Sequence, residues 1–147
     1  MCQKLQIFLK ENKANFLIKY DSVREDNKYT VMFFDTVKKE RISGGDTNSI
    51  IETEQKIITD TNRNVKFNEI NELFSKIKNS VKTNTDFVVM ISINYSDDYL
   101  IYTIYLDKSK KVSHNKFHSY KEMKDFVREN YEWKIDNWYS QFYSEIN

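Results

Sequence analysis

Apolar residues recur along the chain in two rhythms, one typical of helices and the other of strands. Residues 2–12 and 66–81 repeat apolar side chains at steps of three and four, so each segment has one apolar face. A third run of this kind opens at Ser119, whose spacing to Glu122 allows a capping box. The pattern therefore predicts helices at these three places, the last of them either extending through residues 120–146 or breaking near Trp133.

Five other stretches alternate apolar and polar residues or are continuously apolar, as strands do. They are residues 15–21, 28–35, 87–94, 99–107 and 111–117. The second stretch is apolar on both faces, since Met32 and Phe34 alternate with other apolar residues, and this predicts a central strand. The last stretch is rich in lysine. Lysines on an edge strand discourage unwanted pairing, so we expect it at an edge of the sheet.

Residues 36–65 are harder to interpret, because two patterns overlap there. Lys38–Ser43 fits a short strand, and we expect the pair Gly44-Gly45 to end it in a turn, since glycine accepts positive φ without strain. The isoleucines that follow fit a helix capped by Ser49, but they also fit an alternating strand over 51–59. The interpretation we favour is a strand or an irregular segment.

The order of these elements predicts an α+β fold, in which an antiparallel meander packs against two or three helices. No glycine- or proline-rich linker interrupts the chain, so we expect residues 1–147 to form a single domain. Strands lead into a helix twice, at 66–81 and at 120–146. A duplicated strand-strand-helix unit is therefore an alternative to consider, although the residue-level similarity between the two segments is weak.

Composition indicates a folded chain of the cytoplasm. Aromatic residues make up 15% of the sequence and compensate for a modest apolar fraction of 39%, because each ring buries a large area. The single cysteine, Cys2, cannot form an internal disulfide. No apolar run approaches the roughly 20 residues of a membrane span, so we expect no membrane partner. The absence of proline and the scarcity of glycine, beside abundant lysine and asparagine, indicate an AT-rich gene.

Charge and motifs argue against several classes of function. The net charge of +1 lacks the basic excess of a dedicated DNA-binding domain. Two adjacent glycines cannot form a phosphate-cradling loop. His114 and His118 are four residues apart, but lysines surround them and no glutamate lies between them, so we interpret them as surface residues. The pair Asp97-Asp98 is interpreted as a turn. We therefore predict no enzyme, no catalytic residues, no metal site and no cofactor.

Two regions remain as candidate binding surfaces. The first is the basic segment Lys108–Lys124, in which four lysines could contact phosphates or an acidic protein surface: Lys108, Lys110, Lys111 and Lys116. The second is an aromatic cluster near the C-terminus, which holds more rings than one helix face can bury: Trp133, Trp138, Tyr139 and Tyr143. Tryptophan and tyrosine are favoured at protein interfaces.

These observations together lead to a hypothesis of a small non-enzymatic binding protein, monomeric or homodimeric, with a protein partner. The AT-rich composition fits a phage or mobile element, whose accessory proteins include anti-CRISPR inhibitors, so the hypothesis names a host defence nuclease or a nuclease–RNA complex as the partner. A toxin-immunity protein is the first alternative. A nucleic-acid-binding protein that uses the basic segment is the second, and an unrecognised nuclease ranks last.

Overall fold

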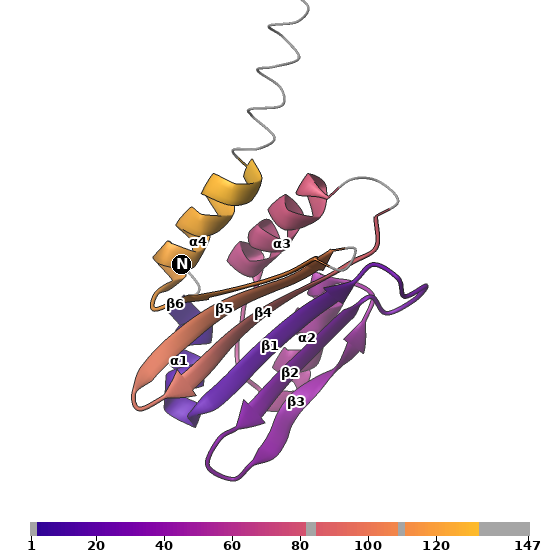
Figure 1. Cartoon of the computed structure of the whole chain (residues 1–147). Coiled ribbons are helices and arrows are strands. Elements are labelled where there is room, and N and C mark those ends of the chain that lie inside the picture. The colour runs from indigo at the N-terminus through magenta and orange to yellow at the C-terminus, as the bar shows by residue number, and fades with distance from the viewer. Residues whose placement is uncertain (1–2, 82–84, 109–110, 133–147) are drawn as a thin grey trace, which may run out of the picture.

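The computed structural model describes residues 3–81, 85–108 and 111–132. This part of the chain forms four α-helices, six strands and one π-helical turn (Figure 1). Their bounds are α1 Gln3–Asn12, β1 Ala14–Asp21, β2 Tyr29–Asp35, β3 Glu40–Thr47, α2 Ile50–Thr61, α3 Asn68–Ser80, β4 Phe87–Ser96, β5 Tyr99–Lys108, β6 Lys111–Phe117, α4 Tyr120–Val127 and the π-helical turn Arg128–Glu132.

The strands form one six-stranded sheet in the order β3-β2-β1-β4-β5-β6, and every neighbouring pair is antiparallel. Two meanders of three strands therefore join at the central pair β1–β4. The predicted α+β class is confirmed, and so is the position of β6 at an edge. The described chain has four helices where two or three were expected, because α2 occupies a segment for which we favoured a strand.

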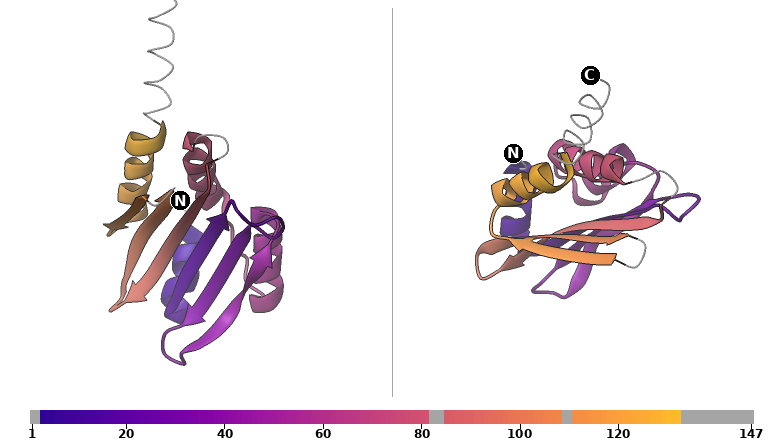
Figure 2. Two further views of the ribbon diagram at one scale, coloured as in Figure 1. Left: turned by 45° about the vertical axis from the view of Figure 1, so that its right-hand side comes forward. Right: turned by 45° about the horizontal axis from the view of Figure 1, so that its top comes forward.

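The molecule has two layers, a sheet and a helical layer, with all four helices on the same side of the sheet (Figure 2). Helix α1 packs over β1, β4 and β5, α2 lies over β2 and β3, and α4 lies over β5 and β6. The core fills the space between the layers. Its largest fully buried rings are Phe16 and Phe33 from the sheet and Phe74 from α3, with Phe67 just before that helix.

The two halves of the chain repeat the same order of elements, which is helix, three strands and helix. The sheet order reads the same from both edges, with Ile18 paired to Ile91 at its centre. Ile18 pairs with Val31 on β2, and Ile91 pairs with Ile104 on β5. Tyr29 and Tyr102, two residues before these partners, therefore occupy equivalent positions in the two halves. The repeat therefore relates α1 to α3 and α2 to α4. It is longer than a strand-strand-helix unit, and the helix that corresponds to α4 is α2, not the helix of residues 66–81.

The same capping box opens both α2 and α4. The Ser49 hydroxyl group accepts a hydrogen bond from the backbone N–H of Glu52, whose carboxylate accepts one from the N–H of Asn48. Ser119 and Glu122 repeat both contacts at the start of α4. Our preference for a strand after residue 49 was wrong. A capping box satisfies backbone groups only at the start of a helix, and the buried positions of α2 have helical spacing.

The glycine pair does not turn the chain, so that prediction was also wrong. Gly44 and Gly45 lie inside β3, opposite Met32 and Val31 of β2. A Cβ atom on Gly44 would lie 2.6 Å from the carbonyl oxygen of Val31. Glycine is thus required here for close approach of two strands. None of the described helices is long and apolar enough to cross a membrane.

Candidate functional site

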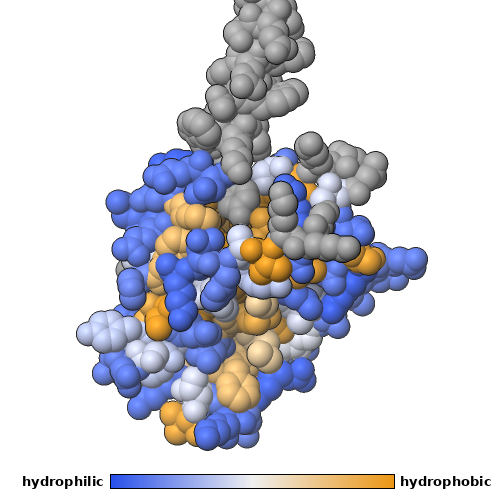
Figure 3. All heavy atoms as spheres, viewed as in Figure 1, coloured by the Kyte–Doolittle hydropathy of each residue, from blue (hydrophilic) through white to orange (hydrophobic). Residues whose placement is uncertain are grey.

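One face of the sheet carries no helix in the described part of the chain, and we call it the open face. Side chains alternate along each strand, so every second residue points away from the helical layer. In β1, Phe16 and Ile18 are buried under the helices, whereas Leu17 and Lys19 between them are partly exposed. The open face faces the viewer in Figures 1 and 3.

The strand pairings place the open-face residues in two neighbouring rows that each cross all six strands. The Met32 row contains Gly44, Met32, Leu17, Ser92, Thr103 and Lys116. The Met90 row contains Asp46, Thr30, Lys19, Met90, Tyr105 and His114.

Large side chains, mostly apolar, occupy opposite halves of the two rows. Met32 and Leu17 are directly paired on β2 and β1, and Met90 and Tyr105 are directly paired on β4 and β5. These four residues, with Phe34 beside Met32, form a diagonal apolar band. Met32 is 36% exposed, and the other four are partly exposed. Figure 3 shows apolar side chains near the middle of this face, with hydrophilic side chains among and around them.

The Met90 row ends in an aspartate at the β3 edge, and the Met32 row ends in a lysine at the β6 edge. At the β3 edge, the Thr30 hydroxyl group and the Arg24 guanidinium group both donate to Oδ1 of Asp46, at 2.6 and 3.2 Å. The hydrogen bond from Thr30, assisted by Arg24, lowers the pKa of Asp46 below its ordinary value. At the β6 edge, His114 and Lys116 are exposed. Asp46 therefore stays ionised at neutral pH, and its side chain is 52% exposed.

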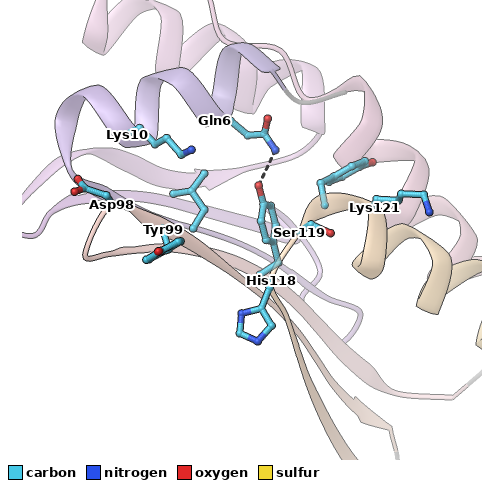
Figure 4. A pocket seen from close by; sticks show the side chains of 10 residues that line it. Gln6, Lys10, Asp98, Tyr99, His118, Ser119 and Lys121 are labelled. Carbon is cyan, nitrogen blue, oxygen red and sulfur yellow. Dashed lines mark hydrogen bonds between the residues drawn. The ribbon is translucent and has the colours of Figure 1, made fainter.

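A recess of about 300 Å³ lies on the helical side, where α1 faces the start of α4 (Figure 4). At its base, Nε2 of Gln6 donates a hydrogen bond of 2.7 Å to the phenolic oxygen of Tyr102. The His118 ring points away from this bond, and Lys10 and Lys121 lie at the margin. Because Gln6 and Tyr102 belong to different halves, the contact joins the halves of the chain.

The first half has a corresponding recess, of about 350 Å³. There Nζ of Lys78 donates to the phenolic oxygen of Tyr29 at 3.0 Å, and lies 4.3 Å from the ring centre of Tyr20. Tyr29 and Tyr102 are equivalent in the repeat, so each is held by a side chain from the first helix of the other half. In both recesses the tyrosine hydroxyl group is therefore engaged in a hydrogen bond that holds the two halves together.

The predicted lysine surface is divided by the structure. Lys116 lies on the open face, whereas Lys108 pairs with Lys111 at the end of the β5–β6 hairpin. Lys110 lies outside the described residues, and so do Trp133, Trp138, Tyr139, Tyr143 and Cys2. The described lysines of β5 and β6 therefore lie at two separate places along the hairpin.

The remaining candidate groups are placed as follows. Asp97 and Asp98 have φ angles of 47° and 66° and join β4 to β5, which confirms the turn. Asp98 accepts a hydrogen bond of 2.7 Å from the hydroxyl group of Tyr95, which raises the pKa of that hydroxyl. His114 lies on the open face and His118 at the start of α4. No group of three histidine, cysteine or acidic side chains that could hold a metal ion occurs in residues 3–81, 85–108 and 111–132.

Sequence reasoning did not identify the open face as a candidate site. Its signal was present in β2, where Met32 and Phe34 alternate with the buried Val31 and Phe33. We interpreted that pattern as a central strand, and β2 does lie between β3 and β1, but the pattern did not show that one of its faces has no helix over it. Comparison with known proteins adds no assignment, since no family model, curated protein or solved structure matches the chain.

Proposed function

We propose that the chain is a binding protein that acts without catalysis, by covering part of a protein partner with its open face. The observation that supports this is the apolar band centred on Leu17, Met32, Met90 and Tyr105. A sheet with one covered face normally has polar residues on the other. Contiguous exposed apolar side chains mark interaction sites, because the partner removes them from water.

Charge around the band favours a protein partner over a nucleic acid. The described residues on and beside the open face include four basic and three acidic side chains: Lys19, Arg24, Arg41 and Lys116, and Asp21, Asp46 and Asp107. A phosphate backbone needs a surface of predominantly positive charge. A protein surface with an apolar centre and charges of both signs at its rim fits the face better.

The form of action we assign is inhibition of a defence nuclease in the cytoplasm, by a protein that a phage or mobile element encodes. Support for this finer assignment is compositional, in the AT-rich, proline-free sequence with a single cysteine. A binding surface on a small chain can block a nuclease simply by occupying the surface that its substrate needs. An immunity protein bound to a toxin would use the same physics.

The test is affinity capture from a nuclease-treated lysate of a low-GC bacterium that carries defence systems, read by mass spectrometry. The bait is compared with the variant Leu17→Glu/Met90→Glu, which places two charges in the apolar band. Ile51→Glu is the matched control, because Ile51 is 70% exposed on α2, on the helical side of the molecule. We expect one protein in near-stoichiometric amount with the wild type and the control, and its loss with the open-face variant.

Inhibition is then measured on the captured protein with its own substrate. Equal capture by all three baits would show that the open face is not the binding surface. If the bait captures nucleic acid before nuclease treatment and nothing afterwards, the result would support nucleic-acid binding through the exposed lysines, including Lys116.

A further inference from the structure

The open face is complementary to itself, and we propose that a second copy of this chain covers it when no other partner is bound. The regulatory part of this inference rests on the proposed function, since the second copy and the target would compete for one surface. The dimer itself rests on the positions of residues in the Met32 and Met90 rows.

The complementarity follows from a two-fold axis that lies in the interface parallel to the strands. Such an axis places β3 of one copy over β6 of the other, and β2 over β5. Met32 then lies over Thr103 of the second copy, and Tyr105 over its Thr30, because each pair shares a row. Leu17 lies over Ser92 in the same way. Large side chains thus meet small ones along most of the band, as close packing between two sheets requires.

One polar contact distinguishes this axis from the other face-to-face arrangement. With the axis parallel to the strands, Asp46 of one copy lies over His114 of the other, whose ring N–H can donate a hydrogen bond to it, and Lys116 lies over Gly44, beside the stem of the Arg41 side chain. Both hydrogen bonds to Asp46 in the described chain use Oδ1, which leaves Oδ2 for the second copy. An axis across the strands would instead place Lys116 over His114, and Asp46 over Gly44, which has no side chain to donate a hydrogen bond.

The size of the face is sufficient for a specific dimer. Six strands about 4.8 Å apart and roughly seven residues long give the sheet a flat area of roughly 500–600 Å². The uneven surface of the side chains adds to this area. The two copies together therefore bury more than the roughly 1,000 Å² that separates specific interfaces from incidental ones. The interface is isologous, so each copy uses its open face once and this contact ends at two copies.

The experiment begins with sedimentation equilibrium of the wild type, of Leu17→Glu/Met90→Glu and of the control Ile51→Glu. We expect a dimer for the wild type and the control. In the open-face variant the dissociation constant should rise at least about tenfold, as it does when a buried apolar anchor is lost. A monomeric wild type, or an open-face variant that dimerises as well as the control, would overturn the proposal.

Crosslinking then identifies the axis. Sheets pack about 10 Å apart, beyond the reach of a disulfide, so a short bis-maleimide reagent is used on chains in which Cys2 is replaced by Ser. Mixing Met32→Cys with Thr103→Cys chains should give a covalent dimer, whereas Met32→Cys with Thr30→Cys should not. The reverse pattern would indicate the axis across the strands and contradict the proposal.

Competition separates this inference from the proposed function. The crosslinked Met32→Cys/Thr103→Cys dimer should no longer capture the partner that the wild type captures. If the free protein is monomeric but the open-face variant still loses its partner, the second copy is excluded and the proposed function stands. If the crosslinked dimer forms and captures the partner undiminished, the two events use different surfaces and the competition is refuted.

Discussion

At the scale of single residues, Gly44 shows how one position can determine the spacing of two strands. A β-carbon added to Gly44 would lie on the open face of the sheet. It would be 2.6 Å from the Val31 carbonyl oxygen and 3.2 Å from the Cα of Met32. Both obstacles are backbone atoms and cannot rotate away. A side chain here would separate β2 from β3 at the place where the pairing shifts between Phe33 and Phe34.

Gly44→Ala should therefore lower the free energy of unfolding by about 1–3 kcal/mol, the usual cost of forcing an extra carbon into a packed site. Urea denaturation followed by circular dichroism measures the change. Ser92→Ala, which removes one oxygen from the same face without a steric conflict, should stay within about 0.5 kcal/mol of the wild type. Equal stability of Gly44→Ala and Ser92→Ala would show that the strands can separate freely here.

A second residue-scale feature is the contact of Ser43 with Asp60, which joins β3 to α2. The Ser43 hydroxyl group donates to Oδ2 of Asp60 at 2.6 Å, and Nζ of Lys56 lies 3.3 Å from the same oxygen. The hydrogen bond from Ser43, assisted by Lys56, lowers the pKa of Asp60 below its ordinary value of 3.8. A carboxyl group of this kind stabilises the fold above its unfolded pKa, and that contribution is lost as the pH falls through the folded pKa.

Asp60→Asn should accordingly flatten the acid side of the stability profile. Between about pH 5 and pH 2 the wild type should lose more unfolding free energy than the variant, because only the wild type must protonate a stabilised carboxylate. Urea titrations at several pH values give the two profiles. Glu72→Gln, which changes an exposed carboxyl on α3, is the control. Parallel profiles for wild type and Asp60→Asn would contradict the assignment.

At the scale of elements, α2 is the segment that the sequence left ambiguous. A helix buries Ile50, Thr53 and Ile57 and exposes Ile51, as the structure shows. An alternating strand would instead place Ile51 and Ile57 on the same face. Different burial of Ile51 and Ile57 therefore indicates a helix, whereas equal burial would indicate a strand.

Ile57→Ala should cost about 2–5 kcal/mol of unfolding free energy, since it empties a fully buried site beneath α2. Ile51→Glu should change stability by no more than about 0.5 kcal/mol, because the side chain is exposed. Thermal and urea unfolding of the two variants measure the contrast. Similar losses in both would favour the strand.

The elements that sequence reasoning predicted well are those whose pattern is local. Alternation identified β1, β2, β4 and β5, and helical spacing identified α1 and α3, because each pattern is complete within its own segment. Gly44 was misjudged since its requirement comes from the Val31 carbonyl oxygen, thirteen positions away. The open face was missed for the same reason. A strand that contains residues such as Met32 has the same sequence pattern whether or not a helix from elsewhere in the chain covers that face.

At the scale of the whole molecule, the halves of the chain are interlocked. Helix α1 belongs to the first half but packs over β4 and β5 of the second as well as over β1. Helix α3 belongs to the second half, and its Phe74 contacts Tyr29 of β2 in the first. The bonds from Gln6 to Tyr102 and from Lys78 to Tyr29 cross between the halves in the same way. Each half therefore lacks part of its own helical cover.

Fragments 1–66 and 67–147 should consequently fail to unfold cooperatively when each is studied alone. Mixed in equal amounts, they should recover native-like circular dichroism and a single urea transition, because the missing helix then returns to each half. A fragment that unfolds cooperatively by itself would show that the crossing contacts contribute little.

The crossed helices are also the arrangement that duplication and fusion of a gene for one half would produce. A chain of one half's length, with its own first helix placed over a neighbour's strands, would have been complete only as a pair of identical molecules related by a two-fold axis through the centre of the sheet. Duplication and fusion of its gene would turn that pair into a single polypeptide. The two serine-initiated helices, Ser49 with Glu52 and Ser119 with Glu122, are then copies of one ancestral feature. Asp46 and Lys116, which occupy equivalent strand positions with opposite charge, are places where the copies have diverged.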